Sequence, residues 1–142
     1  MTQLHPQLQQ DCIYLGKLEL CHLLLMNDSQ YPWCILVPDR DNIKEFYELS
    51  NEEQLLLCRE SSFLAAGMMA AFAGDKMNVA ALGNVVAQLH VHHIVRFRSD
   101  PAWPAPVWGK LPAQAYGKAA LEQTIHTLHR QLANKVNWSN EA

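Results

Sequence analysis

The sequence lacks the features that mark exported, membrane-spanning or nucleic-acid-binding chains. Residues 1–6 have neither a basic patch nor a following apolar run, so no secretory signal is expected. No apolar stretch is expected to be long enough to cross a membrane. Eleven basic side chains stand against 14 acidic ones, a net charge of −3, which provides no general attraction to a nucleic acid.

The cysteines form no metal-binding or redox motif. Cys12, Cys21, Cys34 and Cys58 stand 9, 13 and 24 residues apart, so no Cys-x-x-Cys pair occurs. They are expected to be reduced thiols of a cytoplasmic protein. Neither a metal site nor a cofactor is expected.

Length and composition favour one compact domain that spans residues 1–142. Apolar residues make up 49% of the chain and charged residues 18%. A domain of this size can bury about two thirds of the surface that its unfolded chain exposes. A full hydrophobic core is therefore possible.

Alternating apolar residues predict an antiparallel sheet of about five strands. Residues 12–26 contain two candidate strands broken near Gly16, and residues 27–32 have the composition of a turn. A third strand at 33–37 stops at Pro38. Two further strands are expected at residues 76–82 and 88–97.

Helices are predicted on either side of the last two strands, which makes the fold class α+β. A short helix is expected around Ile43, Phe46 and Tyr47. A long helix follows, with Ser50 and Glu53 as a capping box and Gly74 as its end. A terminal helix is expected at about 113–133, after a loop rich in proline and tryptophan, with a frayed tail from residue 134.

The chemistry is expected in the row that runs from Gln88 to Val95. In an extended chain Gln88, His90 and His92 share one face, while the apolar residues between them share the other. Two adjacent imidazoles could hold one phosphate or one metal ion. His93 falls on the apolar face and is expected to be a structural or interface residue.

The row resembles the histidine triad superfamily of nucleotide hydrolases and transferases, whose motif is His-φ-His-φ-His-φ-φ with φ apolar. The resemblance covers the core at residues 12–108. It includes Asn27-Asp28 after the second strand, Leu36-Val37-Pro38, and Gly83-Asn84-Val85-Val86 where the family often has Gly-Gln-x-Val. It implies the same α+β fold and a homodimer formed by joining two sheets edge to edge.

The resemblance also implies roles for individual residues. His90 would be the nucleophile at the α-phosphate of a purine nucleotide or nucleotide conjugate, such as a dinucleoside polyphosphate or a nucleoside phosphoramidate. His92 would donate a hydrogen bond to the phosphate. Asn27 or Asp28 would bind the ribose and Ile35 would pack on the base. Asn84 would replace a glutamine that reaches the phosphates.

Two departures from the motif concern proton handling. Gln88 replaces the first histidine, and Trp33 stands where the family usually has a fourth one; both positions are expected behind the nucleophile. Gln88 can still orient His90 through its backbone carbonyl, but its side chain does not titrate. A nucleotide-binding module with little turnover is therefore one alternative. A metalloenzyme with His90 and His92 as ligands is another, for which Gln88 is a poor third ligand.

Two further features are expected to bear on this site. Arg96 and Arg98 follow the histidine row and could place positive charge near a phosphate tail. The tryptophan-rich loop could close over the site or pack on a partner subunit.

Overall fold

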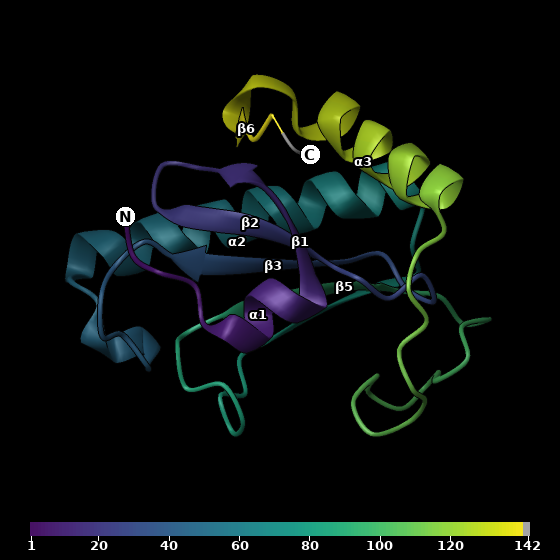
Figure 1. Cartoon of the computed structure of the whole chain (residues 1–142), viewed down its shortest axis with the longest axis horizontal. Coiled ribbons are helices and arrows are strands. Elements are labelled where there is room, and N and C mark those ends of the chain that lie inside the picture. The colour runs from purple at the N-terminus through teal and green to yellow at the C-terminus, as the bar shows by residue number, and fades with distance from the viewer. Residues whose placement is uncertain (141–142) are drawn as a thin grey trace.

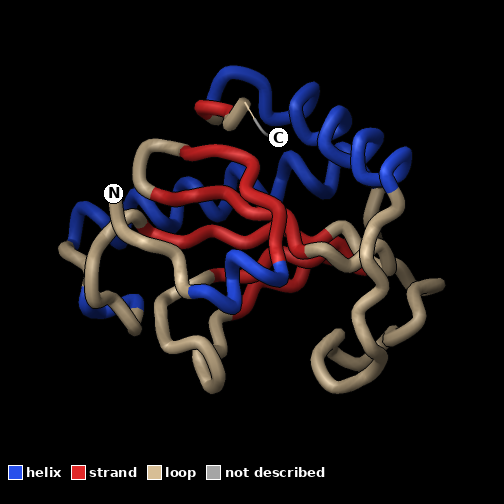
Figure 2. Tube along the Cα trace, in the orientation of Figure 1, coloured by secondary structure: helices blue, strands red, loops and turns tan. Residues whose placement is uncertain are grey.

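The computed structural model describes residues 1–140 and consists of one antiparallel sheet with helices on both faces (Figures 1 and 2). The six strands stand in the order β4-β5-β3-β2-β1-β6. The elements are α1 (Pro6–Asp11), β1 (Cys12–Lys17), β2 (Cys21–Met26), β3 (Trp33–Pro38), η1 (Phe46–Glu48), α2 (Asn51–Phe72), β4 (Lys76–Ala80), β5 (Val91–Arg96), α3 (Lys118–Leu132), η2 (Ala133–Lys135) and β6 (Asn137–Trp138).

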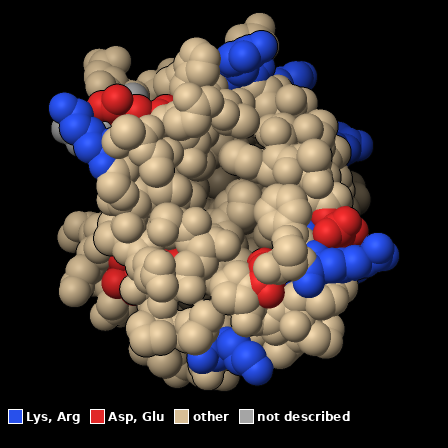
Figure 3. Space-filling view, turned by 90° about the vertical axis from the view of Figure 1, so that its right-hand side faces the viewer, with Lys and Arg blue, Asp and Glu red and all other residues tan. Residues whose placement is uncertain are grey.

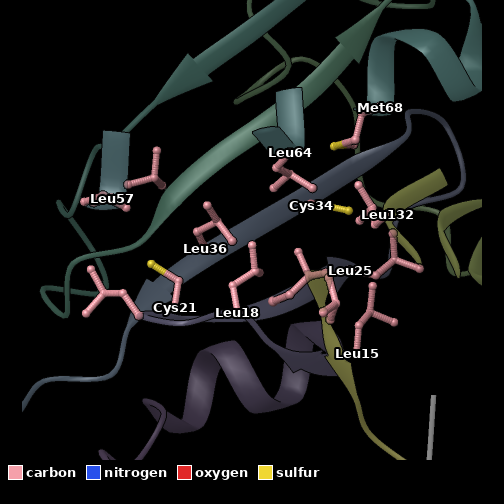
Figure 4. Close-up of a cluster of buried hydrophobic side chains, with 14 of the residues drawn as sticks. Leu15, Leu18, Cys21, Leu25, Cys34, Leu36, Leu57, Leu64, Met68 and Leu132 are labelled. Atoms are coloured by element: carbon pink, nitrogen blue, oxygen red, sulfur yellow. The ribbon is translucent and has the colours of Figure 1, made fainter. Parts of the chain in front are cut away.

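One face of the sheet carries the main core. In Figure 1, α2 crosses behind the sheet and α3 packs beside it. Figure 4 shows the apolar side chains that fill this layer, where the strand residues meet those of the two helices. The cluster includes Leu15, Leu23, Leu25, Cys34, Leu36, Leu57, Leu64, Met68, Val91, Val95 and Leu132. Burial of this cluster is the main source of stability, at roughly 25 cal/mol per Å² of apolar surface removed from water.

The opposite face is covered by shorter segments. The strand residues that alternate with the main core pack under α1 and under the loops at residues 82–89 and 97–117. This second cluster contains Leu8, Leu24, Tyr31, Trp33, Ile35, Val37, Val86, Ile94, Ala102 and Val107. Because these covers are short segments, the face leaves room for cavities between them.

The long helix α2 begins where the sequence predicts. The Ser50 hydroxyl accepts a hydrogen bond from the Glu53 amide, and the Glu53 carboxylate accepts one from the Ser50 amide. Its end differs from the prediction, since Ala73 and not Gly74 adopts the left-handed conformation, with φ of 52°. A side chain at position 74 would collide with Val95, so that glycine is needed for packing.

By length and composition alone, α2 is long and apolar enough to span a membrane. The expectation that no stretch is long enough was therefore wrong. In this structure α2 packs on the sheet and on α3. A core helix passes the same test, because both environments favour apolar residues.

Residues 134–140 are more ordered than predicted. The tail forms β6, with Gly16 opposite Trp138, so the expected fraying was wrong for residues 134–140. Residues 141 and 142, to which that expectation also applied, lie outside the described residues. A bulge at Gly16 lets β1 accept this sixth strand at its edge.

The terminal helix begins at Lys118 and not at 113, since the preceding residues are extended along the turn that follows β2. The short helix expected near residue 43 is the single 3-10 turn η1.

Candidate active site

The two predicted site histidines lie together at the start of β5. His90 directly precedes the strand and His92 is its second residue. Their ring centroids are 4.9 Å apart, and their relative exposures are 7% and 5%. Both rings are on the face that α1 covers. The alternation read from the sequence therefore places them correctly, even though β5 starts at residue 91 and not at 88.

His90 is oriented by the backbone of Gln88. Its Nδ1 lies 2.7 Å from the Gln88 carbonyl oxygen, an acceptor, so Nδ1 carries the proton and donates it. In the neutral ring the other nitrogen, Nε2, then has a free lone pair. This is the arrangement that a nucleophilic imidazole requires.

His92 has the opposite assignment of nitrogens. The indole Nε1–H of Trp33 donates to His92 Nδ1 at 3.0 Å, so the proton of the neutral His92 ring is on Nε2. Burial lowers the pKa of His92 to about 3, and charge on His90 and on His93 lowers it further. His92 is therefore a neutral hydrogen-bond donor near pH 7.

The side chain of Gln88 faces the N-terminal segment and not His90. Its Oε1 accepts a hydrogen bond from the His5 amide at 2.8 Å, and its Nε2 donates to the Gln3 carbonyl at 3.1 Å. The sequence suggested that Gln88 and Trp33 would sit together behind His90. They do not, because Trp33 bonds to His92 while the Gln88 amide holds residues 3–5.

His93 lies on the other face, as its position in the row predicts. It is fully buried, its Nδ1 donates to the Val91 carbonyl at 3.1 Å, and its Nε2 accepts from the Ser61 hydroxyl on α2 at 2.7 Å. Burial lowers the pKa of His93 to about 4. Its role is to tie β5 to α2.

Two cavities share Asp11, Met26 and Trp108 in their linings, and the first of them borders the histidine pair. The first, of about 380 Å³, is lined by Gln7, Leu8, Asp11, Met26, Leu82, Gly83, Asn84, Val85, Val86, His90, His92 and Trp108. The second, of about 400 Å³, is lined by Gln10, Asp11, Met26, Asn27, Asp28, Trp33, Val107, Trp108, Gly109, Leu111 and Ala113. Both volumes are in the range of small-molecule sites.

The tryptophan-rich loop closes over the site, which was one of the two expectations for it. The Trp108 ring centroid is 5.0 Å from that of His92 and 5.9 Å from that of Trp33, both edge to face. Such pairs hold aromatic rings in defined orientations. Trp108 therefore forms part of the wall next to the histidines.

Arg96 fixes this loop and is not available to a phosphate, contrary to one expectation. Its guanidinium donates to both carboxylate oxygens of Asp100, at 2.8 and 3.1 Å, and to the carbonyl of Ala105 at 2.8 Å. It is 1% exposed. A charge that is buried and fully paired in this way stabilises the loop instead of attracting ligand. Arg98 is solvent-exposed.

The residues expected to bind a nucleotide are only partly placed to do so. Asn84 is exposed on the wall of the first cavity, and Asn27 and Asp28 line the second. Ile35 is wrong as a contact for the base, since it is 0% exposed in the cluster that Leu8 covers. Its place in the strand pattern was correct, but α1 lies over it.

The helix α1, which contributes Gln7, Leu8, Gln10 and Asp11 to the two cavities, was missed. Its signal is present: Pro6 stands at the first helical position, directly after the N-cap His5. A helix of six residues has no periodicity that would set it apart from a loop. Nothing in the local sequence indicated that it would border the site.

No group of three or more His, Cys, Asp or Glu side chains within residues 1–140 is arranged to hold a metal ion. His90 and His92 are close together, but Trp33 already occupies one nitrogen of His92. The donor set at this site is thus two imidazoles without a third ligand.

Comparison with known proteins gives one family. A model of the HIT domain matches residues 7–99. A histidine triad protein from Marinobacter aquaeolei VT8 is 55% identical, with a TM-score of 0.90, over 93% of this chain and 96% of that chain. Histidine triad proteins from Sinorhizobium meliloti 1021 and Bradyrhizobium japonicum are 42% and 40% identical, both with a TM-score of 0.89, over 92% and 91% of this chain and 96% of each of those chains. The search of curated proteins finds no match.

Proposed function

The chain belongs to the HIT domain family, and we propose that it is a nucleotide hydrolase or transferase that acts at a nucleoside α-phosphate. The observation that carries this proposal is the complementary pair of imidazoles on one cavity wall. His90 Nε2 offers a lone pair, and His92 Nε2–H offers a proton for a hydrogen bond. A nucleophile beside a donor is what displacement at phosphorus requires.

In the proposed first step, the lone pair of His90 Nε2 forms a bond to the α-phosphorus. The bond from phosphorus to the leaving group breaks, and the leaving group departs with the electron pair. The ring becomes positively charged, and the Gln88 carbonyl stabilises that charge by accepting the Nδ1–H hydrogen bond at 2.7 Å. The product is a nucleotidyl-histidine.

In the proposed second step, water attacks the same phosphorus and the bond to His90 Nε2 breaks, which returns a neutral imidazole and releases a nucleoside monophosphate and a proton. His92 donates through Nε2–H to a non-bridging phosphate oxygen in both steps. Because the pKa of His92 is lowered to about 3, it remains a donor of fixed tautomer and does not itself titrate near neutral pH.

Proton transfer to the leaving group is the step that the residues of this site support least. Gln88 cannot supply a proton, and its amide is bound to the N-terminal segment. General acid help is typically worth about 10²- to 10⁴-fold. This observation favours, as a second candidate function, a nucleotide-binding module with little turnover.

The proposed ligand is a purine nucleotide or nucleotide conjugate, either a dinucleoside polyphosphate or a nucleoside phosphoramidate. Each cavity, at about 380 and 400 Å³, is near the lower end of the usual range for small-molecule sites. One nucleoside in one cavity and the leaving group in the other would use both sides of Trp108.

The proposal includes a homodimer in the cytoplasm. At one edge of the sheet, β4 pairs with β5 and with no other strand of residues 1–140, and Val79 on β4 is 49% exposed. An unpaired apolar edge strand is a surface that a second copy can cover. All four cysteines are free, which supports a reducing compartment.

Trapping of the covalent intermediate tests the function. The protein is mixed with excess adenosine 5′-phosphoramidate labelled in the adenosine, quenched in alkali, and analysed for label on the His90 peptide by mass spectrometry. Stoichiometric labelling that is absent in His90→Asn and retained in His126→Asn, on the exposed side of α3, supports the enzyme. Tight nucleotide binding without labelling supports the binding module, and absence of both refutes the proposal.

A further inference from the structure

Three aromatic rings enclose the ring of His92. Its centroid lies 4.9 Å from that of His90, 5.0 Å from that of Trp108 and 5.6 Å from that of Trp33. The hydrogen bond from Trp33 to Nδ1 sets the tautomer. The direction of Nε2–H also depends on the tilt of the imidazole, and contact with the Trp108 ring limits that tilt.

The direction of this donor is important because no cation lines the two cavities. Among residues 1–140, their linings contain neither a lysine nor an arginine. Figure 3 shows a face that is hollowed near its middle, with its lysines and arginines toward the margin. In the proposed reaction, charge that develops on the phosphate is therefore stabilised by neutral donors such as His92, whose effect depends on distance and angle.

Two anchors earlier in the tryptophan-rich loop hold Trp108. The guanidinium of Arg96, the last residue of β5, donates to the Ala105 carbonyl at 2.8 Å. Val107 is 5% exposed and belongs to the apolar cluster that contains Trp33. Because the residue directly before Trp108 is buried and the one three positions before it is bonded to Arg96, the indole has little freedom to leave His92.

Asp100 holds Arg96 in place for this contact. Its carboxylate accepts from the guanidinium at 2.8 and 3.1 Å. It also accepts from the backbone amides of Phe97, Ala102 and Trp103, at 3.0, 3.1 and 2.8 Å. The side chains of Arg96 and Asp100 are each 2% exposed, and neither lines either of the two cavities. One carboxylate thus joins the end of β5 to the loop without reaching the site.

Stability alone is a poor explanation for this ion pair. A buried pair adds little net stability compared with apolar residues of similar volume, because both charges must be removed from water. The guanidinium instead provides fixed bond directions, since its donors form a rigid planar fork. Bonds of fixed direction define one loop conformation, which is what a side chain placed against a catalytic imidazole requires.

We propose that the buried pair of Arg96 and Asp100 sets the rate of transfer to His90, because it holds Trp108 against the ring of His92. Asp100 is then a positioning residue, which acts through Trp108 and does not touch the ligand. This inference rests on the proposed function. It adds a residue outside both cavities on which the same site depends.

The test is a double-mutant cycle on the rate of label transfer from adenosine 5′-phosphoramidate to His90, measured in a single turnover at saturating substrate. Asp100→Asn and Trp108→Ala should each slow transfer about tenfold or more. The double variant should be no more than about twofold slower than Trp108→Ala alone, whereas independent effects would multiply to about 100-fold or more. Asp100→Asn should leave KM within about twofold of wild type, since the residue lines neither cavity.

Two variants serve as controls. Trp108→Phe keeps a ring beside His92 and should retain the rate to within about threefold of wild type. Asp75→Asn removes another carboxylate that accepts an amide of the segment after β5, that of Arg98 at 2.8 Å, and Asp75 is exposed. This second control should transfer at the wild-type rate.

A further variant is needed if Asp100→Asn does not fold, as judged by circular dichroism, because it leaves the Arg96 charge buried and unpaired. The paired replacement Arg96→Met with Asp100→Leu removes the ion pair without leaving a buried charge. It then enters the cycle in place of Asp100→Asn, with the same expected rates.

Proton NMR of the His92 ring provides a readout that needs no turnover. The ring current of Trp108 shifts the signals of the His92 ring protons, so Asp100→Asn should move them toward their positions in Trp108→Ala. Unchanged His92 signals in folded Asp100→Asn, a wild-type transfer rate in that variant, or effects that multiply in the double variant would overturn this inference and leave the proposed function intact. Absence of transfer in the wild type overturns the proposed enzyme, and the NMR comparison still decides whether Asp100 holds Trp108 against His92.

Discussion

Replacement of Trp33 by phenylalanine removes the one hydrogen bond that sets the tautomer of His92. Trp33 Nε1 donates to His92 Nδ1 at 3.0 Å in a buried environment. Phenylalanine retains most of the ring surface that contacts Tyr31 and Trp108. The change is therefore nearly confined to one donor, and the core should remain packed.

The magnitude follows from the buried acceptor that this change leaves behind. A buried acceptor without a partner costs about 1–3 kcal/mol. His92 can avoid this cost by moving its proton to Nδ1 if that nitrogen finds another acceptor, but Nε2 then has no proton to donate to phosphate. Loss of a transition-state donor typically costs about 10²- to 10³-fold in kcat. A mixture of tautomers should give a reduction of about 10- to 100-fold.

The assay combines single-turnover kinetics with ¹⁵N NMR of the histidine rings. The wild type should show His92 with its proton on Nε2, and Trp33→Phe should show a shifted or averaged pattern together with the slower transfer to His90. Trp138→Phe is the matched control, since the Trp138 indole also donates one hydrogen bond, in its case to the carbonyl of Ala133 at 2.8 Å, and Trp138 lies on β6 at one edge of the sheet. A rate in Trp33→Phe within about threefold of wild type, with changed ring signals, would refute the reasoning about the tautomer.

Three further outcomes are expected. Because the pKa values of His92 and His93 are lowered to about 3 and about 4, the unfolded chain binds more protons than the folded one below pH 6.5. The free energy of unfolding should then fall as the pH falls from about 6 to 4, by up to about 1.4 kcal/mol per pH unit for each histidine. Urea titrations at pH 7, 5.5 and 4.5 that give one constant value would contradict this. Gln88→Ala should free residues 3–5 and increase amide exchange at His5, while His90 keeps its backbone acceptor and transfer slows by less than about tenfold; unchanged exchange would show that the side chain does not hold this segment. Sedimentation at micromolar concentration should give a dimer of the 16.1 kDa chain, and Val79→Lys should give a monomer because it places charge on the paired edge; a monomeric wild type would exclude the proposed dimer.

Much of the fold follows from local sequence patterns. Alternation between the two faces of a strand places His90 and His92 on one side and His93 on the other, and this is fixed by the backbone geometry of an extended chain. The capping box of Ser50 and Glu53 involves residues three positions apart, so it can be read without tertiary information. The likeness of residues 88–94 to the triad motif then led to the correct family.

The side-chain contacts of Gln88 and Trp33 were decided only by the tertiary structure. The Gln88 side chain bonds to His5, 83 positions away, and Trp33 bonds to His92 across 59 positions. No periodicity predicts such pairs, because each depends on which segments meet after the sheet has formed. The same holds for α1, whose Leu8 covers Ile35 and whose Asp11 reaches both cavities. Local sequence thus fixes the faces that the histidines occupy and the carbonyl that orients His90, whereas long-range packing decides which nitrogen of His92 carries its proton.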